Sequence, residues 1–486
     1  MAALSTPGKP ATVLAMFRTV SLPLWLLVLI LAFAAVTFAS HFLFPSVRWF
    51  FRRRMERVVA RLNERLDRPI QPFKLMQRQD MIARLIHDPK VMEAVVEQAR
   101  ETGAPENVAF HEARTYAREI VPGFSATLYF GFATRAAKAL SKLLYDVRVG
   151  RFEAEEIGEI DPDATVIFVM NHRSNMDYVL VTWLVARRSA LSYAVGEWAR
   201  VWPLSRLIRA MGAYFIRRGS RNTLYRRVLA RYVQMATEAG VTQAVFPEGG
   251  LSLDGRVGSA RMGLLSYILA GYRPGESRDV VFIPVGIAYD RVVEDRLLTE
   301  AHVTGVRRFR ARPLAILGFL GRTLWRMLRG RFPGFGRAGV SFGKPLSLAA
   351  FMAQTGRVEP EALGARLMAD IAAVVPALPV PLVAALCADG PVPRADLTNR
   401  LTALMARLSA MGVSGPLTPV EQDEALREGL RALEKRDILR ESDGRLQTAP
   451  GKAALIEFYA APIRQHLDAV AASVTPNSRQ SSTNET

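Results

Sequence analysis

The stretch ATVIFVMNHRSNMD (164–177) passes directly from an apolar run to a polar loop. A short apolar run that ends in turn-forming residues is typical of a strand buried inside a sheet. His172 follows the carboxyl end of this strand, and Ser174 or Asn175 is placed to begin a helix. Asp177 then falls in the first turn of that predicted helix.

His172 and Asp177 are five positions apart, and on a continuous helix this spacing would turn their side chains about 140° away from each other. A turn between them lets the carboxylate curl back and accept a hydrogen bond from one imidazole nitrogen. The other nitrogen is then free to act as a base, and with no nucleophile beside the pair, the hydroxyl of a substrate would attack. A pair that only ties the loop down would have the same sequence.

Other short apolar runs alternate with helix-length segments around this strand. The runs are 147–149, 191–195, 213–216, 242–246, 279–289 and 339–342, and a helix is predicted over 222–239. This alternation predicts an α/β fold, with a mostly buried mixed sheet flanked by helices.

The pattern divides the chain of 486 residues into five predicted parts. They are an N-terminal segment (1–48), a helical membrane-proximal region (49–145), the α/β domain (146–350), a C-terminal helical domain (351–473) and a tail (474–486). The C-terminal domain is similar to a winged helix, with helices over 395–411, 419–436 and 453–468 and a polar hairpin at 443–448. The tail has too few apolar residues to fold, which predicts disorder.

The composition indicates an anionic partner. Lys and Arg number 64 against 45 Asp and Glu, which gives a formal charge of +19. Nucleic acid, phospholipid headgroups or a phosphorylated small molecule would each match this charge. Cys387 is the only cysteine, so the chain forms no intrachain disulfide and no cysteine-based metal site.

The N-terminal segment predicts a single membrane-spanning helix. No charged residue occurs from Thr19 to Val47, and the apolar core at about 22–44 is long enough to cross roughly 30 Å of hydrocarbon. A cleaved signal peptide is the alternative, with a poor cleavage site at 37–39. Six arginines follow between Arg48 and Arg61, so the positive-inside rule places the rest of the chain in the cytoplasm.

A second basic and apolar stretch lies between Gly305 and Gly339. It contains nine arginines and no acidic residue, interleaved with aromatic and aliphatic residues. Such a stretch suits the surface of an anionic bilayer, with its arginines at the headgroups. A helix packed on its own domain with a solvated basic face is an equal alternative. A nucleic-acid groove is not expected beside a membrane span.

Four motifs follow one another along the α/β region: NHRSNMD (171–177), GAYFIRR (212–218), FPEGG (246–250) and VVFIPVGIAYD (280–290). Together and in this order they resemble the four sequence blocks of the glycerolipid acyltransferases, which act on glycerol 3-phosphate and 1-acylglycerol 3-phosphate. The runs FIRR, SARMGLLS (259–266) and IPVGIAYDRVVE (283–294) are most similar to the glycerol-3-phosphate sn-1 acyltransferases, and EFYAAPIRQHL (457–467) resembles the closing segment of their long members.

The resemblance implies a role for each matching residue. His172 would take the proton from the acceptor hydroxyl as it attacks an acyl thioester, and Asp177 would orient His172 and stabilise its imidazolium. Arg218 would grip the phosphate of the acceptor, with Arg217 as a second candidate beside it. A guanidinium suits this role because its planar donors bind two phosphate oxygens at once.

The third and fourth blocks add further expectations. Glu248 would hold acceptor hydroxyls, Gly249 would allow close approach of the backbone, and Pro284 would shape the thioester or acyl-chain site. An ordinary turn with a surface glutamate is the other interpretation of the third block. Where the family usually continues E-G-x-R-S, this chain has Leu251 in place of the arginine. Arg261 is the expected substitute, ahead of Arg256.

The sequence thus predicts a membrane-anchored acyltransferase that transfers a fatty acyl group from acyl-CoA or acyl carrier protein to the sn-1 hydroxyl of glycerol 3-phosphate. Its expected partners are the bilayer, the thioester carrier and glycerol 3-phosphate, with no nucleic acid, no metal and no other cofactor. The alternative within the same class is acylation of 1-acylglycerol 3-phosphate at its second position. A non-catalytic membrane adaptor that binds phospholipid or nucleic acid is the alternative outside it.

Overall fold

The computed structural model describes residues 23–150, 157–186, 188–196, 204–217, 219–306, 321, 325, 329, 332, 334–356, 359–416 and 418–474. The chain divides into two compact units, Met1–Glu64 and Arg65–Thr486. The predicted tail from 475 onward and most of the basic stretch between Gly305 and Gly339 lie outside the described residues.

The larger unit is built on a mixed sheet of eight described strands, in the order β1-β7-β6-β2-β5-β3-β4, with β8 beside β6. β6 runs antiparallel to β7 and β8, and the other neighbouring pairs are parallel. The strands are β1 (Asp146–Val149), β2 (Thr165–Met170), β3 (Ser192–Val195), β4 (Tyr214–Phe215), β5 (Gln243–Val245), β6 (Val280–Tyr289), β7 (Arg337–Phe342) and β8 (Leu346–Ser347).

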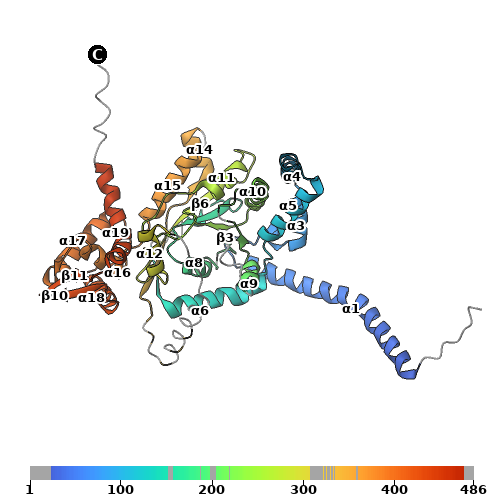
Figure 1. Cartoon of the computed structure of the whole chain (residues 1–486), viewed down its shortest axis with the longest axis horizontal. Coiled ribbons are helices and arrows are strands. Elements are labelled where there is room, and N and C mark those ends of the chain that lie inside the picture. The colour runs from blue at the N-terminus through green and yellow to red at the C-terminus, as the bar shows by residue number, and fades with distance from the viewer. Residues whose placement is uncertain are drawn as a thin grey trace, which may run out of the picture. The chain divides into compact units, whose positions relative to one another are not determined.

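Both faces of this sheet are buried at its central strands, and β2 shows how the sequence achieves this. Val166, Phe168 and Met170 point into one apolar cluster, while Ile167 and Val169 point into another. The alternation follows from the two-residue period of a strand. Because both sets are apolar, the strand reads as a continuous apolar run. Figure 1 shows α8 and α6 on one side of the sheet and α10, α11 and α15 on the other.

The helices around the sheet fall into groups along the chain. Those before and within the α/β region are α2 (Pro72–Leu75), α3 (Arg78–Ile86), α4 (Pro89–Thr102), α5 (Glu106–Ile120), the π-helical η2 (Thr127–Ala133), α6 (Thr134–Leu144), α8 (Met176–Val185), α9 (Leu204–Ala210), α10 (Thr223–Glu238), α11 (Met262–Ala270), α12 (Asp295–Thr304), α14 (Leu348–Thr355) and α15 (Pro360–Ala373). The predicted helix over 222–239 is confirmed as α10, whose N-cap Asn222 accepts a hydrogen bond from Tyr225 N.

The C-terminal region adds a small second sheet surrounded by helices. Its elements are α16 (Pro379–Cys387), β9 (Val392–Pro393), η4 (Arg394–Asp396), α17 (Leu397–Ala410), α18 (Pro419–Lys435), β10 (Leu439–Ser442), β11 (Arg445–Thr448) and α19 (Ala453–Val474). The predicted hairpin is confirmed, because β10 and β11 pair antiparallel around Asp443 and Gly444. Thr418 begins α18 with a capping box to Glu421, a sequence signal of helix start.

The smaller unit contains helix α1 (Leu24–Asn63), which covers the segment predicted to cross a membrane. Its first turns expose large apolar side chains, among them Leu24, Trp25 and Phe33. Within the described residues, no helix combines the length and the apolarity that crossing a bilayer requires. The structure therefore does not support the membrane-spanning helix predicted at about 22–44.

Candidate active site

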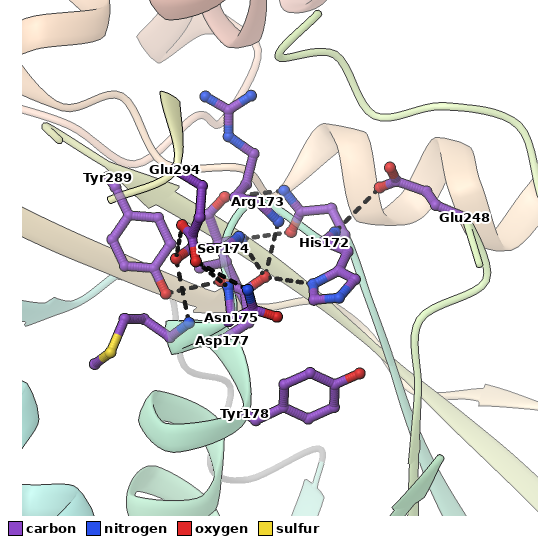
Figure 2. A network of polar contacts seen from close by, with 12 residues as sticks. His172, Arg173, Ser174, Asn175, Asp177, Tyr178, Glu248, Tyr289 and Glu294 are labelled. Atoms are coloured by element: carbon purple, nitrogen blue, oxygen red, sulfur yellow. Dashed lines mark hydrogen bonds and ion pairs between the residues drawn. The ribbon is translucent and has the colours of Figure 1, made fainter. Parts of the chain in front are cut away.

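His172 and Asp177 meet across the turn between β2 and α8, as Figure 2 shows. His172 Nδ1 lies 2.9 Å from Asp177 Oδ2, and the two side chains are only 2% and 0% exposed. The imidazole packs against the rings of Phe246 and Tyr178, with centroid distances of 4.1 and 5.4 Å, and the two rings also contact each other. Among the described residues, its Nε2 has no hydrogen-bond partner. The base-and-orienter geometry predicted from the spacing is therefore present.

The Asp177 carboxylate accepts hydrogen bonds at both oxygens. Oδ2 accepts from the backbone N–H groups of Arg173 and Ser174 at 2.7 and 3.0 Å, in addition to His172. Oδ1 accepts from the hydroxyl of Tyr289 at 2.8 Å. Burial, and next the charge of Asp177, raise the pKa of Tyr289 well above its ordinary value, so the tyrosine stays a donor. The carboxylate is thus fixed in position by four donors.

Glu294 closes the turn from the opposite side. Its carboxylate accepts from the Ser174 hydroxyl at 2.8 Å, and from the backbone N–H and the side-chain amide of Asn175 at 3.3 and 3.0 Å. Glu294 is the N-cap residue of α12, which follows β6. Two residues at the end of β6 and just after it therefore fix this region: Tyr289 binds Asp177, and Glu294 binds the turn between His172 and Asp177.

Two further contacts hold the backbone around His172. The side-chain amide of Asn171 exchanges two hydrogen bonds with the backbone of Ile287, at 2.8 and 2.9 Å, so it takes the place of a strand neighbour at the edge of β6. The carbonyl of His172 accepts a hydrogen bond from the backbone N–H of Ser252 at 2.8 Å. These contacts leave the loop little freedom to shift the imidazole.

Arg173 connects this loop to the C-terminal helix α19. Its side chain is 2% exposed, points away from the dyad, donates to the carbonyl of Gly255 and lies 4.4 Å from the ring of Phe458. Gly255 has φ of +89°, and a Cβ there would lie 2.1 Å from the Phe458 carbonyl oxygen. Only glycine fits this position, so the loop after β5 and helix α19 pack backbone against backbone.

Glu248 lies beside the dyad, as the third block predicts. Its Oε1 accepts a hydrogen bond from the backbone N–H of His172 at 3.2 Å. Burial raises the pKa of Glu248 to about 8, although the hydrogen bond from His172 opposes the shift. At neutral pH the protonated carboxyl can accept from His172 and donate through its other oxygen. The interpretation as an ordinary surface glutamate does not fit a side chain this deeply buried.

Gly249 and Arg261 lie against each other next to Glu248. Gly249 has φ of +68°, and a Cβ there would lie 2.8 Å from Cδ of Arg261. The backbone N–H of Arg261 donates to the carbonyl of Pro247 at 2.8 Å, which places Arg261 directly before α11. Its side chain is exposed and forms no ion pair among the described residues. Arg261 is therefore a cation available to an anionic ligand near the third block.

The other predicted binding residues are placed differently. Arg217 makes a bidentate contact with Glu119, the shorter at 2.8 Å, and its guanidinium carbon lies 5.2 Å from the ring of Tyr116. This arginine is already engaged by a carboxylate. Arg218 lies outside the described residues. Pro284 is buried in β6 opposite Val169, and its carbonyl accepts from the backbone N–H of Gly343. The structure does not bring Arg217 into contact with the dyad.

Tyr289, Glu294 and Arg173 lie within the four motifs or the adjoining segment, but no role was predicted for them. The signal for Tyr289 lies in the strand order of the sheet, which the sequence does not give. β2 and β6 are parallel neighbours, so residues that follow Met170 and residues at the end of β6 reach the same edge of the sheet. Glu294 is harder to find, because its partner Ser174 is 120 positions away and only the turn after β6 brings them together.

Removal of the Tyr289 hydroxyl should slow the reaction without unfolding the protein. Tyr289→Phe leaves one lone pair of the buried Asp177 without a donor, at a cost of about 1–3 kcal/mol. We expect kcat to fall about 10- to 100-fold and KM to change little, because Tyr289 acts through Asp177. Steady-state kinetics over a range of pH test this. The matched control is Tyr232→Phe, a buried tyrosine in the other apolar cluster. An equal loss in both variants would contradict the assigned role.

The raised pKa of Glu248 predicts a pH-dependent stability. The folded state keeps the proton up to about pH 8, while the unfolded chain releases it near its ordinary value of 4.5. Between these values a rise in pH favours unfolding, so the free energy of unfolding should decrease as the pH increases. In Glu248→Gln this part of the decrease, on the order of a few kcal/mol, should be absent.

Urea unfolding of both proteins at several pH values between 4.5 and 8 measures the effect. Asp290 is also buried, and burial raises its pKa to about 7, which adds a decrease of the same sign. This contribution is common to both proteins, so the difference between them isolates Glu248. Parallel curves for the two proteins would show that Glu248 is ionised in the folded state at neutral pH.

Comparisons with known proteins agree with the resemblance seen in the motifs. The family described as Acyltransferase matches residues 151–288, and the family described as Glycerol-3-phosphate acyltransferase C-terminal region matches residues 321–467. The glycerol-3-phosphate acyltransferase of Pseudomonas putida (strain GB-1) is 29% identical over 283 residues, and that of Alteromonas mediterranea is 27% identical over 283 residues. These alignments cover 58% and 57% of this chain.

The aligned part is 33% of each of these two relatives, so the chain spans about a third of their length. Among solved structures, the 1-acyl-sn-glycerophosphate acyltransferase of Thermotoga maritima is 20% identical, with a TM-score of 0.31, over 53% of this chain and 78% of that one. The two family matches lie on the α/β region with the His172–Asp177 dyad and on the C-terminal region with α19. The chain therefore carries a region similar to the Acyltransferase family over residues 151–288 and a region similar to the C-terminal region of glycerol-3-phosphate acyltransferases over residues 321–467.

Proposed function

We propose that the chain transfers a fatty acyl group from a thioester, acyl-CoA or acyl carrier protein, to the sn-1 hydroxyl of glycerol 3-phosphate. The product would be 1-acylglycerol 3-phosphate. The observation that carries this proposal is the buried His172–Asp177 contact, in which Nδ1 is bound and Nε2 is left without a partner among the described residues. The names of the relatives support glycerol 3-phosphate as the acceptor.

In the proposed reaction, Nε2 of His172 removes the proton from the acceptor hydroxyl as its oxygen attacks the thioester carbonyl. The new C–O bond forms, the C–S bond breaks, and the imidazolium returns its proton to the departing thiolate. Asp177 stabilises the imidazolium while it exists. The proposed reaction draws on no metal and no other cofactor.

The binding roles are proposals as well. Glu248 lies beside the imidazole loop, so its protonated carboxyl would hold an acceptor hydroxyl near His172. Arg261 and Arg218 would bind the phosphate of glycerol 3-phosphate. The guanidinium of Arg261 is exposed and forms no ion pair with any described residue, which supports its part in this. Arg217 would contribute charge from a greater distance, since it is bound to Glu119. Pro284 would shape the thioester or acyl-chain site from within β6.

We further propose that the protein acts at a membrane, anchored near its N-terminus with the catalytic part in the cytoplasm. Six arginines directly after the apolar segment support this orientation, and the exposed apolar side chains of α1 support contact with a membrane. A cytoplasmic location would give the catalytic part access to both acyl-CoA and acyl carrier protein. The basic surface would favour an acidic carrier.

A product assay tests the function. The full chain in detergent is given labelled glycerol 3-phosphate or 1-acylglycerol 3-phosphate, each with acyl-CoA or acyl carrier protein, and mass spectrometry identifies the product and the position of its acyl group. We expect acyl transfer to position 1 of glycerol 3-phosphate. Transfer only to position 2 of the acylated acceptor would replace the proposed acceptor. The absence of product from all four combinations of acceptor and donor would favour the alternative of a non-catalytic membrane adaptor.

A further inference from the structure

An exposed apolar stripe runs along η2 and α6. Phe132, Leu140 and Leu143 are 57%, 39% and 51% exposed. Ala136 and Ala139 lie between them and are also exposed. The spacing of the four residues from Ala136 to Leu143 places them on one side of the helix. We call these five residues the α6 stripe. The other side of α6 is buried through Ala137, Ser141 and Leu144.

Within α6, the charged residues beside the α6 stripe are all cations. Arg135, Lys138 and Lys142 are exposed, and none of the three forms an ion pair within the described part of the chain. No acidic residue occurs in the sequence between Glu119 and Asp146. A solvated helix face usually carries both signs of charge. An apolar stripe with one sign of charge beside it fits a surface that is apolar inside and anionic at its edge.

A cavity lies at the C-terminal end of α6. Lys142 and Leu143 line this cavity of about 840 Å³, whose wall includes the aromatic rings of Phe332 and Phe335. Arg291 and Arg431 contribute cations to this wall. The guanidinium of Arg291 lies 4.6 Å from the ring of Phe335. The wall also includes the carboxylates of Asp146, Asp290 and Glu428, so the cavity carries both signs of charge and the docking surface is confined to the stripe itself.

We propose that the α6 stripe and its three cations dock on the surface of an anionic lipid bilayer. The apolar side chains would enter the boundary between headgroups and acyl chains, and the cations would lie at the headgroups. The stripe lies on a single helix that needs no matching groove, and a bilayer surface can receive such a helix at any point. A protein partner would instead need a groove of matching shape with acidic edges.

This docking has a consequence for the dyad. α6 packs against α8, the helix whose first turn carries Asp177, and Figure 1 shows the two helices side by side. A bilayer that touches the outer side of α6 would therefore be separated from α8, the helix that begins at the active site, by the width of α6 alone. Acyl chains that enter or leave along this route would travel a short distance between the membrane and the reacting groups.

A fluorescent label on the stripe tests the proposal in the full chain. The single native Cys387 is buried, so Ala139→Cys provides one accessible thiol for an environment-sensitive fluorophore. We expect a blue shift of the label, and quenching by lipid-attached quenchers, on mixing with vesicles that contain phosphatidylglycerol. Val108→Cys, on the exposed side of α5, is the matched control and should show neither. The unsubstituted chain should take up no label.

The charge arm compares two triple variants that carry the Ala139→Cys label. Replacement of Arg135, Lys138 and Lys142 by glutamine should weaken partitioning of the label into anionic vesicles by on the order of 100-fold, at about fivefold for each cation. Partitioning into phosphatidylcholine vesicles should change little. Replacement of Arg400, Arg407 and Arg427 by glutamine, on α17 and α18, removes the same charge elsewhere and should have a much smaller effect.

Two results would overturn the proposal. One is a label at position 139 that stays in water while sedimentation shows that the chain is bound to anionic vesicles, since α1 alone would then make the contact. The other is a label that responds to a soluble acidic protein and not to vesicles. None of these readouts requires acyl transfer, so a failure of the proposed reaction and a failure of the proposed docking are distinguishable.

Discussion

Replacement of His172 with alanine is expected to lower kcat by about 10²–10⁴-fold, the contribution of a positioned general base. Among the described residues, the imidazole is the base that Asp177 binds, and the rings of Phe246 and Tyr178 pack against it. The acceptor hydroxyl would have to attack while it still carries its proton. KM should change little, since the imidazole acts mainly as the hydroxyl reacts.

A single-turnover assay with radiolabelled glycerol 3-phosphate and a thioester measures this loss. The matched control is His466→Ala. His466 is also buried, but it lies on α19 and binds the carbonyl of Val375, so its loss should leave kcat within about twofold of the unchanged protein at a temperature where the variant is folded. Vesicle binding should be the same for all three proteins. Full transfer activity in His172→Ala would exclude the dyad as the reacting centre.

The second large effect is expected at Asp177, where the structure makes asparagine and alanine differ. Two backbone N–H groups point at Oδ2, so the oxygen of an asparagine must take that place and still accept from Nδ1 of His172. Its NH₂ group then replaces Oδ1 and can donate to the oxygen of Tyr289, because that hydroxyl is free to turn. Asp177→Asn should therefore keep the imidazole in the same tautomer and lose only the negative charge.

Loss of this charge beside a buried imidazolium is worth about 4 kcal/mol at an effective dielectric constant of 20, so kcat should fall about 10³-fold in Asp177→Asn. Asp177→Ala loses the orientation as well and leaves two buried N–H groups without acceptors. We expect it to be slower still, and less stable by a few kcal/mol. Asp295→Asn is the control, since it removes a buried carboxylate that does not touch His172.

Kinetics and the ¹⁵N chemical shifts of the His172 ring together test this argument. Nδ1 should keep its proton in Asp177→Asn. A shift of the proton to Nε2 in that variant would mean that the amide has rotated, and that the two backbone donors do not determine its orientation. An equal kcat for the asparagine variant and the unchanged protein would show that the charge has no part in the reaction.

The sheet was predictable because each of its longer strands is a short apolar run bounded by turn residues. All seven predicted runs became strands, and the helix over 222–239 and the helix that begins after Asn175 were also expected. β8 was not predicted, because Leu346 and Ser347 form a two-residue strand recognisable only by its pairing with β6. The order of the strands in the sheet could not be predicted either, because nothing in the sequence indicates that β6 lies between β2 and β7.

The candidate site divides in the same way. His172 and Asp177 are close in sequence, and a single turn determines their contact, so spacing alone predicted it. Glu248 and Arg261 were predicted from family motifs, and the structure places Glu248 at the loop of His172. Tyr289 and Glu294 reach the loop from more than 100 positions away, and only the parallel pairing of β2 with β6 brings them there. Arg217 looked available in the sequence because nothing in it reveals the distant Glu119.

Because Arg173 contacts Phe458, the conformation of the loop that carries His172 depends on the presence of α19. A nascent chain released before α19 would hold a guanidinium that faces water, and a loop at Gly255 with no backbone to pack against. Proteolysis that removes α19 should therefore inactivate the protein even though the cut lies almost 300 positions beyond His172. For the same reason, the core alone is a poor choice for expression, and exchange of C-terminal regions between relatives should succeed only when Arg173, Gly255 and the aromatic residue at 458 are exchanged together.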